Sequence, residues 1–116
     1  MMNIKIFHNP RCKKSRAGLE YLRSKTGDIK IIEYLKTGIS EEMIKFILKI
    51  SGLNVSDLIR SQEEFYKKEI KGNLLSDESL IKYITENPKL LQRPIVQKEG
   101  LAVIGDPPEN IDRLFN

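Results

Sequence analysis

The feature that most constrains the fold is the alternation of short β-prone and helical segments within the first 34 residues. Residues 3–7 alternate isoleucine with other side chains, which predicts a strand that Asn9-Pro10 then ends. Residues 13–25 carry apolar side chains at helical spacing, and residues 29–34 predict a second strand. A strand, helix and strand in so few residues form a βαβ unit with parallel strands and a right-handed crossover. The chain is therefore expected to have an α/β fold.

The remaining segments predict a helical middle followed by a ββα end. Ser40 and Ser76 stand where helix N-caps are expected, and Gly52 suits a left-handed helix end. Shorter helices are expected over residues 56–60 and 63–70. Residues 95–97 and 101–104 predict a hairpin, and a last helix is expected to begin near Asp106.

The length of 116 residues fits one domain, here residues 1–116 with a helical insertion at about 40–87. The longest apolar runs, such as Leu101–Ile104, are far too short to cross a membrane. Residues 1–5 lack the pattern of a signal peptide. A cytoplasmic location without membrane contact is therefore the expectation.

One cysteine and one histidine limit the chemistry. A disulfide within the chain and a cysteine-rich zinc site are excluded, and no metal is expected. The net charge of +4 equals the charge of residues 8–16 alone, which hold four cations and no acid. A nucleic-acid-binding protein usually spreads its basic residues over a face and interleaves aromatics, yet this chain is 7% aromatic and has no Trp. A small anionic partner is expected rather than a nucleic acid.

Cys12 lies in the predicted turn between the first strand and the first helix. The free N–H groups and dipole of a helix start favour an anion, and neighbouring cations lower the pKa of a thiol further. The cations here are Arg11, Lys13, Lys14 and Arg16. The alternative is that Cys12 is a small buried apolar residue and His8 a core histidine. Ser15 could equally cap the helix or donate a hydrogen bond to the thiolate.

Four segments then resemble one family. Residues 8–16, His-Asn-Pro-Arg-Cys-Lys-Lys-Ser-Arg, resemble the active-site segment of the glutaredoxin-dependent arsenate reductases of the ArsC type. Leu58-Ile59-Arg60 resembles the middle arginine segment of that family, and residues 87–96 its Asn-Pro…Arg-Pro-Ile-Val segment. Residues 104–109 resemble its closing motif. The resemblance covers essentially the whole chain in the same order.

The resemblance implies a thioredoxin-like fold with a four-stranded mixed sheet and a cis bond between Arg93 and Pro94. It also implies roles for individual residues. Cys12 would be the nucleophile, His8 and Ser15 would tune it, and Arg60 and Arg93 would bind the oxyanion. The supporting residues of the site would be Asn9, Arg11, Arg16 and Pro94.

The implied reaction is attack of the Cys12 sulfur on the arsenic of arsenate. Glutathione, as a co-substrate, would attack the adduct, and a glutaredoxin would resolve the glutathionyl product. Arginine forks grip tetrahedral oxyanions with paired hydrogen bonds, which suits this substrate. A protein with one cysteine needs an external thiol because it has no resolving partner of its own. No bound cofactor is expected.

One position departs from the family pattern. Members with the closing motif usually carry arginine where this chain has Asp106, whose carboxylate would repel arsenate if it faced the site. If Asp106 instead caps the last helix, its carboxylate has no effect on the chemistry. A monothiol oxidoreductase acting on glutathione mixed disulfides is an alternative, because Cys12 with Ser15 in place of a second cysteine suits that chemistry. Regulators of the related Spx type, which bind RNA polymerase, are another, although they usually carry a Cys-x-x-Cys that is absent here.

Overall fold

The computed structural model describes residues 3–115 and divides into two compact units. The first comprises the chain up to Thr37 together with the chain from Arg93 onward, and the second comprises Gly38–Gln92. Residues 1, 2 and 116 lie outside the described part. Residues 1 and 2 belong to the segment 1–5, for which the sequence predicts no signal peptide, so that prediction falls partly outside the described residues. The organisation as one domain with an insertion stays a prediction.

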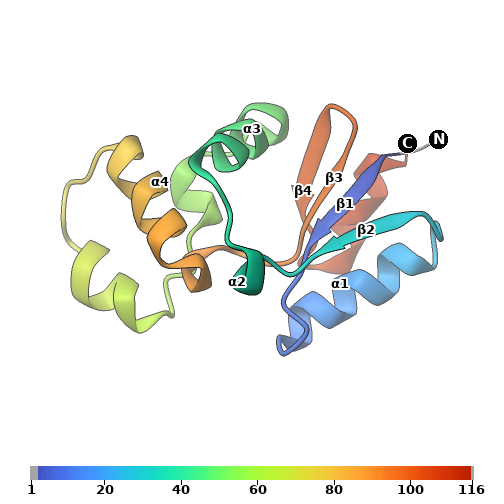
Figure 1. The fold of residues 1–116 in the computed structure, drawn as a ribbon, viewed down its shortest axis with the longest axis horizontal. Helices are drawn as coiled ribbons and strands as arrows, with labels where there is room; N and C mark the ends of the chain where they lie inside the picture. The colour runs from blue at the N-terminus through green and yellow to red at the C-terminus, as the bar shows by residue number, and fades with distance from the viewer. Residues whose placement is uncertain (1–2, 116) are drawn as a thin grey trace. The chain divides into compact units, whose positions relative to one another are not determined.

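A four-stranded mixed sheet forms the centre of the first unit (Figure 1). Its strands are β1 (Ile4–Phe7), β2 (Ile29–Ile32), β3 (Ile95–Lys98) and β4 (Leu101–Ile104), in the order β2-β1-β3-β4. Strand β1 pairs in parallel with β2 and antiparallel with β3, and β3 pairs antiparallel with β4. The predicted α/β class, the parallel βαβ pair and the hairpin are confirmed.

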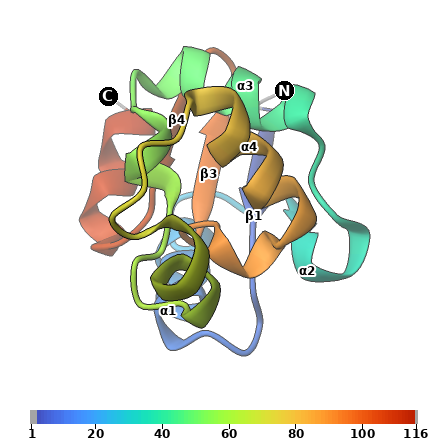
Figure 2. The same cartoon turned by 90° about the vertical axis from the view of Figure 1, so that its left-hand side faces the viewer.

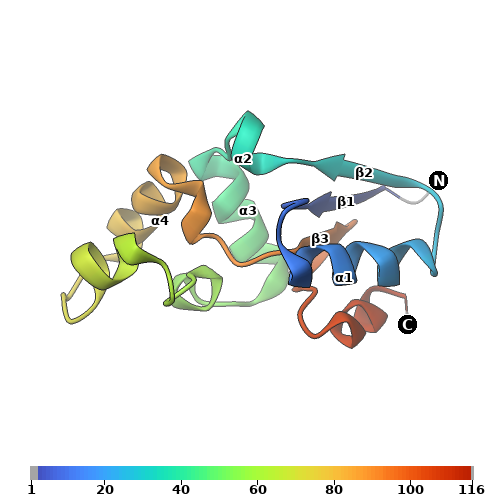
Figure 3. The ribbon, with the colours of Figure 1, turned by 90° about the horizontal axis from the view of Figure 1, so that it is seen from below.

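Helix α1 (Lys13–Arg23) and the 3₁₀ helix η4 (Pro108–Leu114) cover one face of this sheet (Figure 3). Every second residue of a strand points to the same face, so Ile4 and Ile6 of β1 both reach this layer. They form a buried apolar cluster with side chains of α1, η4 and the hairpin, namely Leu19, Leu22, Val96, Val103, Ile111 and Leu114. This layer fixes the start of α1 beside the end of β1.

Three boundaries differ from the sequence prediction. Helix α1 ends at Arg23 rather than at residue 25. The second strand ends at Ile32, and Tyr34, expected to be in the strand, begins the short helix α2 (Tyr34–Thr37). Asp106 is not a helix cap, because Pro107 occupies the N-cap position of η4.

The second unit is helical (Figure 2). It contains α3 (Glu41–Ser51), the 3₁₀ helix η1 (Val55–Leu58), the π-helix η2 (Tyr66–Ile70), α4 (Asp77–Glu86) and the 3₁₀ helix η3 (Pro88–Leu90). The expected caps are confirmed: Ser40 accepts from the Met43 N–H, Ser76 accepts from the Ser79 N–H, and Gly52 is left-handed with φ 72°. The two shorter helices form as 3₁₀ and π turns rather than as α-helices.

A short backbone ladder joins the middle of the second unit to its C-terminal end. Ile59 and Leu91 form an antiparallel bridge, and the Arg60 N–H donates to the Leu90 carbonyl at 2.7 Å. This ladder fixes the backbone of Arg60. Within residues 3–115 no helix combines the length and the apolar character needed to cross a membrane.

Candidate active site around Cys12

The loop that carries Cys12 is held by its own backbone between β1 and α1. The His8 N–H donates to the Ile32 carbonyl at 2.9 Å and extends the pairing of β1 with β2. The side chain of Asn9 accepts from the Arg11 N–H at 3.0 Å, and the Cys12 N–H donates to the Asn9 carbonyl at 3.0 Å. These bonds form a tight turn that delivers Cys12 to the N-cap position of α1.

The Cys12 sulfur lies where a thiolate is stabilised. Its side chain forms no conventional cap hydrogen bond, but the backbone N–H groups at the helix start interact with the sulfur. Burial alone would raise the pKa of the thiol. The Ser15 N–H, the Arg93 side chain and the Lys14 N–H outweigh that effect and leave the pKa of Cys12 below its ordinary value. Cys12 is only partly buried, so the thiolate is accessible to a reactant.

Arg93 reaches the sulfur from the segment that leads into β3. The Arg93–Pro94 peptide bond is cis, as the family resemblance implies, and the Asp106–Pro107 bond is also cis. The Gly105 N–H donates to the Pro94 carbonyl at 2.8 Å and fixes this segment at the end of the hairpin. The structure therefore brings together Cys12, Arg93 and Pro94, three of the residues that the resemblance places in the site.

His8 and Ser15 form a buried pair beside the Cys12 loop. The His8 Nδ1 atom and the Ser15 Oγ atom are hydrogen-bonded at 2.8 Å, and the Asn9 N–H donates to the same hydroxyl at 3.0 Å. Ser15 is fully buried and His8 is 5% exposed. The Ser15 hydroxyl thus binds His8 and the Asn9 N–H within the loop. The Ser15 backbone N–H interacts with the Cys12 sulfur and lowers the pKa of the thiol.

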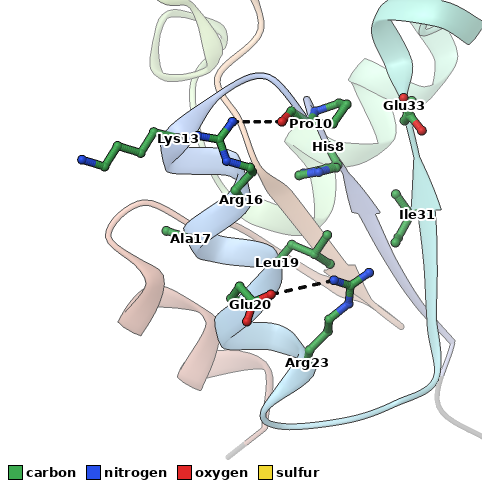
Figure 4. Close-up of a pocket in the computed structure, with 10 residues that line it drawn as sticks. All are labelled: His8, Pro10, Lys13, Arg16, Ala17, Leu19, Glu20, Arg23, Ile31 and Glu33. Atoms are coloured by element: carbon green, nitrogen blue, oxygen red, sulfur yellow. Dashed lines mark hydrogen bonds and ion pairs between the residues drawn. The ribbon is translucent and has the colours of Figure 1, made fainter.

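The surroundings of His8 favour its neutral form. Burial lowers the pKa of the imidazole, Glu33 raises it, and Arg23 and Arg16 lower it again, with a net lowering. His8 lines a hollow of about 610 Å³, together with Arg16, Arg23 and Glu33. Figure 4 shows these side chains beside α1 and β2. The contact of the His8 ring with the Cys12 loop is its hydrogen bond to the Ser15 hydroxyl.

The four cations near Cys12 in the sequence all have exposed side chains. The Arg16 side chain donates to the Pro10 carbonyl at 3.0 Å, which closes the loop from the outside. The Lys14 ammonium pairs with the Asp106 carboxylate at 3.4 Å. Asp106 thus lies beside the start of α1 and neutralises part of the positive charge there.

Arg60 belongs to the second unit, and its side-chain contact lies within that unit. Its guanidinium pairs with the Glu63 carboxylate at 2.7 Å, and its side chain is 15% exposed. The resemblance is what connects Arg60 to the site. Among residues 3–115 no three His, Cys, Asp or Glu side chains gather as metal ligands.

The free N–H groups expected at the helix start are those of Lys14 and Ser15. Sequence reasoning missed one structural support of the site, namely Gly18, a glycine inside α1 that packs against Pro94. A glycine within a helical pattern is itself a signal of close packing, because glycine weakens a helix unless a contact requires it.

The comparisons with known proteins agree with this geometry. The family model of the ArsC family matches residues 7–114. The uncharacterized protein YfgD of Escherichia coli is 41% identical over 110 residues, which cover 93% of this chain and 92% of YfgD. An arsenate reductase of Neisseria meningitidis is 38% identical over 117 residues, which cover 99% of this chain and all of that protein.

Solved structures lead to the same family. An arsenate reductase from Vibrio cholerae superposes with a TM-score of 0.92 at 40% identity and covers 97% of this chain and 98% of its own. The α/β fold with its four-stranded mixed sheet is thus that of a thioredoxin-like protein. Sequence and structure together show that the chain belongs to the ArsC family.

Proposed function

We propose that this protein is a thiol-dependent arsenate reductase in which the Cys12 thiolate attacks the arsenic of arsenate. The observation that carries the proposal is the Cys12 sulfur at the start of α1, with its pKa lowered by backbone N–H groups and by the Arg93 side chain. A thiolate, not a thiol, is the nucleophile in such chemistry. Membership of the ArsC family and relatives named arsenate reductase support the choice of substrate.

The proposed reaction has three steps. The Cys12 sulfur bonds to arsenic and an arsenate oxygen leaves as hydroxide or water. A glutathione thiolate then attacks the Cys12 sulfur, and the electron pair of the sulfur–arsenic bond passes to arsenic, which becomes arsenite. The product is a mixed disulfide of Cys12 and glutathione, which a glutaredoxin thiol resolves by thiol–disulfide exchange.

Arg93 and Arg60 are the proposed oxyanion-binding residues. Arg93 is supported by its contact with the Cys12 sulfur, since a guanidinium there can also donate to an oxygen of the bound anion. Arg60 is supported by the match to the middle arginine segment of the family, and Glu63 orients its guanidinium. Replacing either with alanine should raise the KM for arsenate.

Asp106 is expected to weaken arsenate binding because its carboxylate compensates Lys14 beside the helix start. Asp106→Asn should therefore lower the KM for arsenate, and more so at low ionic strength, where charges are less screened. Glu109→Gln, which removes a charge from an exposed position of η4, is the matched control. An unchanged KM for arsenate in Asp106→Asn would show that the Asp106 carboxylate does not affect arsenate binding electrostatically.

The deciding experiment measures arsenite formation with glutathione and glutaredoxin, next to reduction of a glutathione mixed disulfide. Arsenite formation that disappears in Cys12→Ser supports the proposal. Turnover of the mixed disulfide alone favours the monothiol oxidoreductase. Retained arsenite formation in Cys12→Ser would show that another group is the nucleophile. The folded state of Cys12→Ser is checked by circular dichroism.

Glutathione and glutaredoxin are part of the proposal as reductants. The single cysteine supports an external thiol, because no second thiol exists in the chain to close a disulfide. A cytoplasmic location belongs to the same proposal, since glutathione systems keep thiols reduced in that compartment.

A further inference from the structure

Gly18 lies inside α1, where glycine is unfavourable. It is buried and lies more than a turn from either end of the helix Lys13–Arg23. Alanine has a higher helix propensity than glycine, so alanine would stabilise an isolated helix at this position. The glycine must therefore meet a requirement that comes from outside the helix.

That requirement is the ring of Pro94. A Cβ atom at Gly18 would overlap the Pro94 Cγ atom, and would lie 3.2 Å from the Pro94 Cδ atom and 3.1 Å from the Gly105 carbonyl oxygen. Gly105 also lies close to this ring, since a Cβ atom at Gly105 would lie 3.1 Å from the Pro94 Cγ atom. The Pro94 ring is thus in close contact with two glycines.

The ring position determines where the preceding residue lies. Arg93 is covalently joined to Pro94, and its side chain interacts with the Cys12 sulfur at the start of α1. Cys12 and Gly18 both belong to the α1 segment, so the separation of α1 from Pro94 also sets the separation of the sulfur from Arg93. The Gly105 N–H bond to the Pro94 carbonyl prevents the segment from simply moving away.

We propose that Gly18 is a positioning residue for Cys12 chemistry, because its missing side chain lets α1 close on Pro94 and so holds Arg93 against the sulfur. The inference deepens the proposed function, since it rests on Cys12 acting as a thiolate. It does not depend on the substrate being arsenate.

The test compares the rate of Cys12 alkylation by iodoacetamide across pH in Gly18→Ala and wild type. Weakening a hydrogen bond to a charged group should slow the reaction at pH 7 by roughly threefold to tenfold and move the pH midpoint upward. Ala17→Gly is the matched control. It weakens the same helix at an exposed neighbouring position and should leave the pH midpoint unchanged.

Coupling to Arg93 separates a positioning role from a purely structural one. In an Arg93→Ala background, Gly18→Ala should change the alkylation midpoint no further, because the contact it disturbs is already gone. An equal shift in both backgrounds, or no shift in folded Gly18→Ala, overturns the inference. If Gly18→Ala does not fold, Gly105→Ala, with its milder overlap of the same ring, takes its place in the same pair of measurements.

Failure of the proposed function has a different signature. A wild type that alkylates as predicted but forms no arsenite would refute arsenate reduction and leave the role of Gly18 intact. If arsenite does form, Gly18→Ala should raise the KM for arsenate in the direction of Arg93→Ala, because both variants disturb the same guanidinium.

Discussion

Replacing Ser15 with alanine separates two roles that one residue could have. The hydroxyl of Ser15 is hydrogen-bonded to His8 at 2.8 Å and accepts from the Asn9 N–H at 3.0 Å, and the residue is fully buried. Its backbone N–H, which favours the thiolate, is still present in alanine. Ser15→Ala should therefore destabilise the loop strongly and leave the reactivity of Cys12 nearly unchanged.

The size of the effect follows from the two groups that lose their partner. A buried donor or acceptor left without a hydrogen bond costs about 1–3 kcal/mol, so the loss at two groups should lower the free energy of unfolding by about 2–6 kcal/mol. With a urea dependence of about 2 kcal/mol per M for a small protein, the unfolding midpoint should fall by roughly 1–3 M. Circular dichroism is the suitable signal because the chain has no Trp.

The control for this prediction is Ser24→Ala. The Ser24 hydroxyl donates to the Tyr21 carbonyl at 2.6 Å but is exposed, so its removal should change stability by less than about 0.5 kcal/mol. The reasoning is refuted if Ser15→Ala keeps wild-type stability while its alkylation rate falls as far as that of Arg93→Ala. That result would mean that the hydroxyl serves the thiolate rather than the loop.

Three more outcomes are expected. Arg93→Ala should slow alkylation of Cys12 at pH 7 by about tenfold, the equivalent of about 1.4 kcal/mol for one charge-assisted hydrogen bond, whereas exposed Arg113→Ala should not. The free energy of unfolding should fall as the pH drops below roughly 6.5, because unfolded His8 binds a proton that the buried ring resists, and His8→Gln should reduce this dependence in urea titrations. Leu22→Ala, at a site with 0% exposure, should cost about 2–5 kcal/mol in the same titrations and leave the alkylation midpoint unchanged.

Local signals were sufficient for much of the fold. Ser40, Ser76 and Gly52 were predicted correctly because a helix cap is a bond between near neighbours in the chain. Tyr34 was wrongly predicted as part of a strand. Tyrosine favours strands, but Tyr34 is completely buried in α2 by tertiary packing, which a residue's β propensity does not predict.

Only those parts of the site that lie close to Cys12 in the chain were predictable from local sequence. Cys12 at the start of a helix follows from the nearby sequence, because the turn and the helix pattern are both local. Arg93 approaches the sulfur from a distant part of the chain, and without the family resemblance it would read as an exposed charge. The ion pair of Lys14 with Asp106 is also a long-range contact, so the sequence left the place of Asp106 open between a helix cap and the site.

The pH dependence of Cys12 alkylation in the wild-type protein is the most direct measurement. We predict a midpoint below that of a free cysteine thiol, because the charged sulfur is favoured in the folded protein. Lowering of this pKa also implies that unfolding in denaturant moves the midpoint upward toward the free value. A midpoint at or above that of free cysteine in the folded protein would contradict the thiolate on which the proposed chemistry depends.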